Sequence, residues 1–126
     1  MSPAEFDTKR RMLGLSVDDA AQLCGGVSSR AVNNWMRGEA PIPNDAIQAL
    51  ALLEKQIDNA IDYIVADATD KTESGIVVLL RYRTQQAFEE SQHAAQMPFG
   101  AHAILIGVTA HALEAGGIEV EIFWAN

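Results

Sequence analysis

The stretch that decides the N-terminal fold is GGVSSRAVNNWMRGEAPIP, residues 25–43. It begins with two glycines, which favour a turn, and two serines, whose hydroxyls can accept hydrogen bonds at the start of a helix. A glycine at position 38 and the two prolines that follow predict the end of that helix. The stretch therefore predicts a short helix of about ten residues between two turns.

The predicted helix has two different faces. Polar side chains at the spacing i, i+3, i+4 and i+7 share one face: Arg30, Asn33, Asn34 and Arg37. Apolar side chains take the opposite face, where a protein core belongs: Ala31, Val32, Trp35 and Met36. Arginine can donate two hydrogen bonds to guanine, and asparagine can pair with adenine in the same bidentate way. The polar face therefore suits the base edges of a DNA major groove.

The start of this helix adds a second kind of contact. Ser28 and Ser29 stand where hydroxyls and free backbone N–H groups can hold a phosphate. An ordinary solvated helix would also show polar residues outward. However, asparagine is a poor helix former, and the polar face contains no glutamate or lysine, the usual residues of a solvated face. We therefore predict DNA binding by these serines together with the four polar-face residues.

The preceding segment, LSVDDAAQLCGG, completes the motif. Ser16 can cap a helix, and Asp19 stands at the acidic position of a capping box. Apolar residues recur at helical spacing on one face: Val17, Ala20, Ala21 and Cys24. A helix, a glycine turn and a second helix predict a helix-turn-helix.

The sequence pattern of the rest of the chain changes near residues 66–75, which are polar. Before them the pattern predicts a short helix over residues 3–13 and a long helix from Asn44 to about Ala68. After them it predicts a strand in GIVVLLRYR, helices over residues 84–94 and 101–115, and a half-buried strand in IEVEIFW, where apolar residues alternate with glutamates.

These elements predict an α+β chain with two domains. An N-terminal all-α helix-turn-helix bundle, the DNA-binding domain, takes residues 1–68, and a small β-α-α-β dimerisation part takes residues 69–126. Two strands alone do not make a stable sheet, so pairing with a second copy is expected. Trp124 is assigned to that interface rather than to a ligand platform.

Charge is distributed unevenly along the chain. Residues 1–45 hold five basic and six acidic residues, whereas the remainder holds four basic and eleven acidic ones, which gives the net charge of −8. This asymmetry argues against a protein that coats nucleic acid indiscriminately, but it allows docking through a small basic surface. No apolar run is long enough for a membrane span, and no signal peptide is expected at the N-terminus. A single cysteine excludes an internal disulfide and fits the cytoplasm.

Neither catalysis nor a metal or other cofactor is predicted. His102 and His111 are nine residues apart on one predicted helix and point to opposite sides, and His93 has no ligand partner at a suitable spacing. Cys24 belongs to an apolar helix face, and Trp35 to the core rather than to a base-stacking position. No convergent acid–base pair is present, so an enzyme is not expected.

The segment GVSSRAVNNWMRG resembles the recognition half of the phage-repressor type of helix-turn-helix. The shared positions are Gly26, Val27, Ser28, Val32, Trp35 and Gly38. The turn has one glycine more than that type, and the pattern W-x-x-G-x-x-x-I-P-x-D follows from Trp35 to Asp45. With these two features the chain resembles the YdiL-like proteins, which include the anti-CRISPR-associated transcriptional repressors.

The resemblance implies an N-terminal helix-turn-helix and a C-terminal strand–helix–helix–strand dimerisation part. It implies that Arg30 is the DNA-contacting arginine, whereas Asn33 and Asn34 form a polar pair that differs among members. It further implies a homodimer that represses a promoter through an inverted repeat and, for anti-CRISPR-associated members, binding to an RNA stem-loop of the transcript. Two alternatives stay open: an antitoxin-like protein-interaction module and a ligand-responsive regulator.

Overall fold

The computed structural model describes residues 1–71 and 75–125. It confirms the α+β class, and it divides the chain into two compact units, Met1–Lys55 and Gln56–Asn126. None of the helices in the described ranges is long and apolar enough to cross a membrane. The functional division predicted after residue 68 concerns DNA binding and dimerisation, and it stays a prediction.

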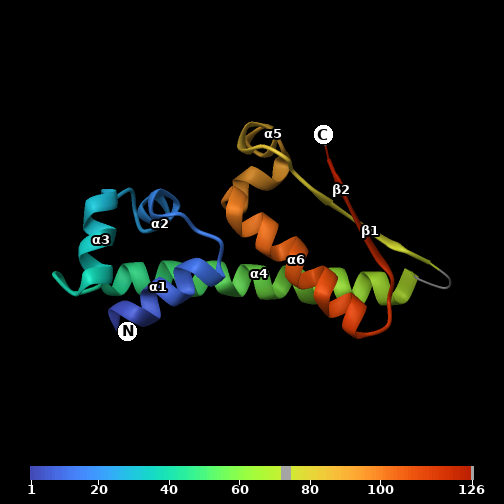
Figure 1. The fold of residues 1–126 in the computed structure, drawn as a ribbon, viewed down its shortest axis with the longest axis horizontal. Helices are drawn as coiled ribbons and strands as arrows, with labels where there is room; N and C mark the ends of the chain where they lie inside the picture. The colour runs from blue at the N-terminus through green and yellow to red at the C-terminus, as the bar shows by residue number, and fades with distance from the viewer. Residues whose placement is uncertain (72–74, 126) are drawn as a thin grey trace. The chain divides into compact units, whose positions relative to one another are not determined.

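The first unit contains helices α1 (Pro3–Met12), α2 (Val17–Leu23) and α3 (Ser29–Arg37), and the start of the long helix α4 (Asn44–Lys71) (Figure 1). The short helices form because their first turns are capped. The predicted capping box of α2 is confirmed: Asp19 N donates to Ser16 Oγ at 3.0 Å, and Ser16 N donates to Asp19 Oδ2 at 3.2 Å. Ser2 and Glu5 form the same arrangement at the start of α1. Local chemistry therefore sets where these helices begin.

Trp35 anchors the core of the first unit, as predicted. Its side chain is 5 % exposed, and its ring meets the ring of Phe6 edge to face, with centroids 5.8 Å apart. The other buried apolar residues of this unit come from α2, α3, α4 and the loop after α1: Leu13, Leu15, Ala20, Ala21, Val32, Ala46, Leu50 and Leu53. The apolar stripe of each helix thus faces one shared core.

The second unit follows the predicted order of a strand, helices and a strand. Its elements are the end of α4, β1 (Val77–Arg81), α5 (Gln85–Glu89), the short 3-10 helix η1 (Gln92–Ala95), α6 (Phe99–Ala115) and β2 (Val120–Trp124) (Figure 1). The two strands are parallel, in register from Val77↔Val120 to Arg81↔Trp124. Parallel strands require a crossover connection, which the helices between them provide.

One face of this sheet is covered and the other is open. Leu79 packs inward with Ala68 of α4 and with Ile106, Ala110 and Leu113 of α6. Ile118 and Val120 pack against this cluster as the predicted alternation requires, but Ile122 and Trp124 are 46 % and 54 % exposed. The predicted half-buried strand is therefore correct only for its first part, because its later residues are not among those packed on the cluster.

Candidate nucleic-acid interface

The turn between α2 and α3 needs both of its glycines. Gly25 and Gly26 have φ angles of 97° and 75°, in the left-handed region that other residues rarely adopt. The carbonyl of Ala21 then accepts hydrogen bonds from the backbone N–H groups of Gly26 and Val27, each at 3.1 Å. Two successive left-handed residues close the end of α2 and turn the chain toward α3. This geometry accounts for the additional glycine in the motif.

The two serines at the start of α3 have different partners. Ser28 is the N-cap residue, and its Oγ accepts a hydrogen bond from Ala31 N at 3.1 Å. The hydroxyl of Ser29 donates to the carboxylate of Asp18 and so ties α3 to α2. The sequence does not predict this contact, because it shows Asp18 only as a member of the first turn of its own helix. Binding of either serine to phosphate stays a prediction.

The predicted polar face of α3 is open to solvent. Arg30 and Arg37 are exposed, and Asn33 and Asn34 are half-buried beside them. Within residues 1–71 and 75–125, neither of these two arginines makes an ion pair or a side-chain hydrogen bond. The helix therefore presents two guanidinium groups that have no partner within the described protein.

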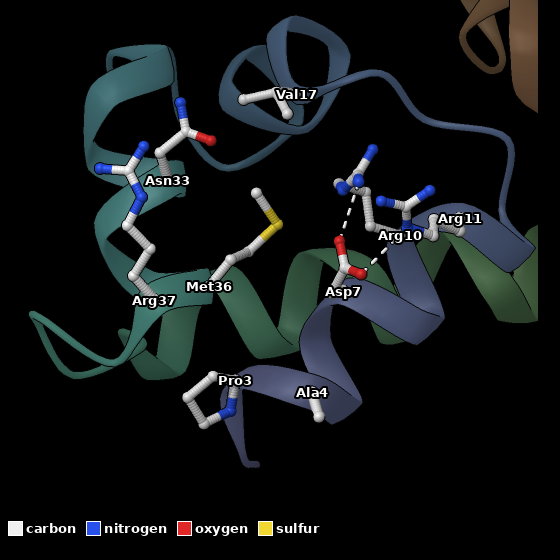
Figure 2. Close-up of a pocket in the computed structure, with 9 residues that line it drawn as sticks. All are labelled: Pro3, Ala4, Asp7, Arg10, Arg11, Val17, Asn33, Met36 and Arg37. Carbon is white, nitrogen blue, oxygen red and sulfur yellow. Dashed lines mark hydrogen bonds and ion pairs between the residues drawn. The ribbon is translucent and has the colours of Figure 1, made fainter.

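The opposite face of α3 agrees only in part with the prediction. Val32 and Trp35 are buried, whereas Ala31 and Met36 are only half-buried. Met36 points from α3 toward the basic side chains of α1 instead of joining the core (Figure 2). The reason is the position of α1, which the helical periodicity of α3 alone does not reveal.

A hollow of about 600 Å³ lies between α1 and α3 (Figure 2). We call it the α1–α3 hollow. Its polar lining consists of Asp7, Arg10, Arg11, Asn33 and Arg37. Asn33 and Arg37 belong to the predicted recognition face, but the α1 residues were not predicted as part of a site. The basic run Lys9–Arg10–Arg11 was the available signal, although the sequence does not show which of its members turn toward α3.

Asp7 organises the α1 side of the hollow. Its Oδ1 accepts a hydrogen bond from Arg10 Nη2 at 2.8 Å, and its Oδ2 accepts one from Arg11 Nε at 2.9 Å. Hydrogen bonds from Arg10 and then Arg11 hold the pKa of the Asp7 carboxyl below its usual value. Asp7 therefore stays ionised and keeps both guanidinium groups on the same side of α1.

The second unit contains a cluster of rings around His102. This imidazole is 5 % exposed, and its centroid lies 5.2 Å from that of His93 and 5.4 Å from those of Tyr82 and Phe88. Burial lowers the pKa of His102 to about 4, and the nearby charges of His93 and Arg81 add to this effect. The side chain is therefore a neutral packing residue near pH 7.

The other predicted non-functional residues have ordinary surroundings. His111, on the same helix as His102, is exposed, so the two histidines do point to different sides. No group of three or more metal-ligating side chains occurs among the described residues. Cys24 is half-buried, and burial raises the pKa of its thiol, which opposes formation of a reactive thiolate.

Comparison with known proteins supports the resemblance seen in the sequence. The profile of the family described as Aca2/YdiL-like matches residues 1–118, which include the helix-turn-helix and most of the second unit. The chain is also 34 % identical over 70 residues to a protein named Aca2 repressor from Pectobacterium phage ZF40. That alignment covers 53 % of this chain and 60 % of the relative. Since the family profile matches nearly the whole sequence, the chain belongs to the Aca2/YdiL-like family.

Proposed function

We propose that the protein is a DNA-binding transcriptional repressor that acts as a homodimer on an inverted-repeat operator. The observation that carries this proposal is the exposed polar face of α3, with Arg30 and Arg37 unpaired within the described residues. An arginine without an intramolecular partner loses no internal ion pair when it binds a base. The name of the relative, a repressor, supports the same function.

The division of labour on α3 follows from side-chain chemistry. Arg30 donates to the O6 and N7 acceptors of a guanine, which is the commonest specific contact in the major groove. Asn33 and Asn34 are half-buried, so they are restricted before DNA arrives and can offer amide groups to an adenine. Val32 and Trp35 hold the helix on the core behind them. The rigid core positions the polar face as one unit.

The homodimer is supported by the open face of the sheet. Val78 and Leu80 point outward from β1, Ile76 directly before the strand is also exposed, and the register places Phe123 beside Leu80 on the same face. Their side chains are between 47 % and 53 % exposed. A twofold dimer brings the same patch of each copy together, so an apolar patch becomes its own partner. The two recognition helices would then read half-sites about 34 Å apart.

Two finer parts of the proposal rest on the family relation alone. The first is control of the operon that contains the repressor's own gene, of the anti-CRISPR type. The second is binding to an RNA stem-loop in the transcript of that operon. In this proposal both roles are carried out in the cytoplasm. Double-stranded DNA is the main partner, and the RNA stem-loop is a second one.

The testing experiment is selection of bound DNA from a random pool at about physiological salt. Wild type, Arg30→Ala and Arg83→Ala are compared, since Arg83 is an exposed arginine of the second unit. Wild type and Arg83→Ala should enrich one inverted repeat. Arg30→Ala should bind that repeat more weakly, by about 1–3 kcal/mol for each guanine that its side chain no longer reads. Circular dichroism checks that all three proteins are folded.

Enrichment of the same repeat by Arg30→Ala with unchanged affinity would contradict the role of Arg30. No enrichment by any of the three proteins would contradict specific DNA binding. If the transcript's stem-loop displaces the selected DNA from the protein and a scrambled RNA does not, the proposed RNA binding is supported. A protein that co-purifies in stoichiometric amount would instead support the antitoxin-like alternative.

A further inference from the structure

We infer that Arg11 of α1 binds a backbone phosphate of the DNA duplex whose major groove receives α3, and that the α1–α3 hollow is where this phosphate lies. The inference rests on the proposed function and deepens it, because it adds a contact from outside the helix-turn-helix. Such a contact sets position and affinity rather than sequence preference.

The hollow carries a positive charge. Three guanidinium groups (Arg10, Arg11 and Arg37) and one carboxylate (Asp7) line it, which leaves a net charge of +2. The unit around it, residues 1–55, has six basic and seven acidic residues, and the whole chain has a net charge of −8. Positive charge is therefore concentrated at the hollow, although the protein as a whole repels a polyanion.

The two arginines of α1 have different tasks. The side chain of Arg10 is 10 % exposed, and its Nη1 donates to the carbonyl of Leu15 at 2.7 Å while its Nη2 holds Asp7. The side chain of Arg11 is 71 % exposed and bonds Asp7 only through Nε. Arginine has five N–H donors in a fork that fits phosphate. Arg10 is thus a structural residue, whereas Arg11 has donors left for a ligand.

The hollow lies directly beside α3, the proposed recognition helix. Asn33 and Arg37 of the recognition face line the same hollow as Arg11 (Figure 2). The major groove is about 12 Å wide and is bordered by rows of phosphates, while packed helices lie about 8–10 Å apart. When α3 lies in the groove, the neighbouring α1 therefore comes over one phosphate row.

Asp7 prepares Arg11 for this contact. The carboxylate fixes the guanidinium at the edge of the hollow before DNA arrives, which lowers the entropy lost on binding. Because Arg11 bonds Asp7 only through Nε, its terminal Nη groups can donate to the phosphate while this bond is kept. Phosphate binding therefore requires no change of partner at Asp7.

The test compares Arg11→Gln with Lys9→Gln. Both variants remove one positive charge from α1, but Lys9 bonds Glu54 at 2.8 Å and does not line the hollow. The dissociation constants for the selected operator and for an unrelated duplex of equal length are measured over a series of salt concentrations. A third variant, Arg11→Lys, keeps the charge, and thermal unfolding verifies that each variant is folded.

Arg11→Gln should weaken binding to both duplexes by a similar factor, roughly fivefold per bound protomer near physiological salt, and should make the slope of log K against log salt shallower by about one per protomer. Arg11→Lys and Lys9→Gln should keep the wild-type slope.

Equal slopes for Arg11→Gln and Lys9→Gln would overturn the inference, and so would a weakening confined to the operator, since that is the behaviour of a base contact. Wild-type protein without preference for any selected duplex would instead overturn the proposed function itself.

Discussion

Helix α3, the proposed recognition helix, and the sheet β1–β2 are opposite kinds of surface. On α3 the apolar residues Val32 and Trp35 are buried, and the side turned to solvent carries arginine and asparagine. On the sheet, Leu79 is buried, but the side turned to solvent carries Val78, Leu80 and other apolar residues. Each element has one buried apolar face, so the two differ in the side chains of the face that is turned to solvent, which are polar on α3 and mainly apolar on the sheet.

This difference bears on the kind of partner that each surface can bind. The outer face of α3 is stable in water without a partner, and it can exchange water for the polar edges and phosphates of a nucleic acid. The outer face of the sheet is unfavourable in water and becomes favourable when a second apolar surface covers it. The outer face of α3 therefore fits the proposed DNA contact, and the outer face of the sheet fits the proposed dimer contact.

The largest effect is expected for Trp35→Ala. Removal of this buried ring should lower the free energy of unfolding of the first unit by about 3–5 kcal/mol, because a cavity replaces its packing against Phe6. Urea unfolding followed by circular dichroism measures the change. Met36→Ala is the control, since Met36 is half-buried and should cost clearly less. Equal destabilisation by the two variants would show that α3 is not anchored through Trp35.

The next effect concerns the open sheet face. Phe123→Asp should weaken the proposed dimer by about 2–4 kcal/mol, because it removes the aromatic side chain of the patch and buries a charge in its place. Sedimentation equilibrium measures the dissociation constant. Val108→Asp is the control, because Val108 is 46 % exposed but lies on α6. Dissociation by Val108→Asp with no effect of Phe123→Asp would place the interface on α6 instead.

A smaller effect is expected from acid. The pKa of His102 is lowered to about 4 in the folded protein, so between pH 6.5 and pH 4 the unfolded chain binds one more proton than the folded chain. The part of the free energy of unfolding that depends on neutral His102 is therefore fully present above pH 6.5. It is lost as the pH falls from 6.5 to 4. From pH 7 to pH 5 the decrease should be about 2 kcal/mol.

Urea unfolding of wild type and His102→Phe at several pH values tests this expectation. The phenylalanine keeps an aromatic ring beside Tyr82 and Phe88 but does not titrate, so its stability should change less with pH. His111→Gln is the control, since His111 is exposed and should leave the wild-type pH dependence unchanged. A His102→Phe protein as acid-sensitive as wild type would contradict the expectation.

The smallest effect is expected at the start of α3. Ser28→Ala removes the oxygen that accepts from Ala31 N and should cost about 1 kcal/mol of stability. Ser28→Asn can form the same cap and should retain most of it. Thermal unfolding compares the two variants. If they are equally stable, the cap does not contribute to the order of α3.

The first unit was predictable from the sequence because its determinants are local. The cap at Ser16, the glycines at positions 25 and 26 and the spacing of Val32 and Trp35 all act within a few residues. The Ser29–Asp18 contact and the placement of Met36 were not predictable, because they depend on how separate helices pack. The α1–α3 hollow was not predictable for the same reason.

The second unit was predictable in order but not in arrangement. A β-branched and aliphatic run indicates its first strand, and the alternation of apolar residues with glutamates indicates its second. Neither pattern fixes whether the strands pair in parallel or which residues lie opposite each other. The exposure of Ile122 and Trp124 also follows from how far the buried cluster around Leu79 extends, which is a non-local property.

The parallel pairing of β1 with β2 has a consequence for synthesis. Val77 pairs with Val120, so the ribosome must finish the crossover helices before the first strand can find its partner. The three capped helices of the first unit, by contrast, are complete once α4 has begun to emerge. A nascent chain therefore acquires α3 early and its sheet late. Slow translation between residues 81 and 120 would prolong the period in which a strand with an open edge is exposed to other chains.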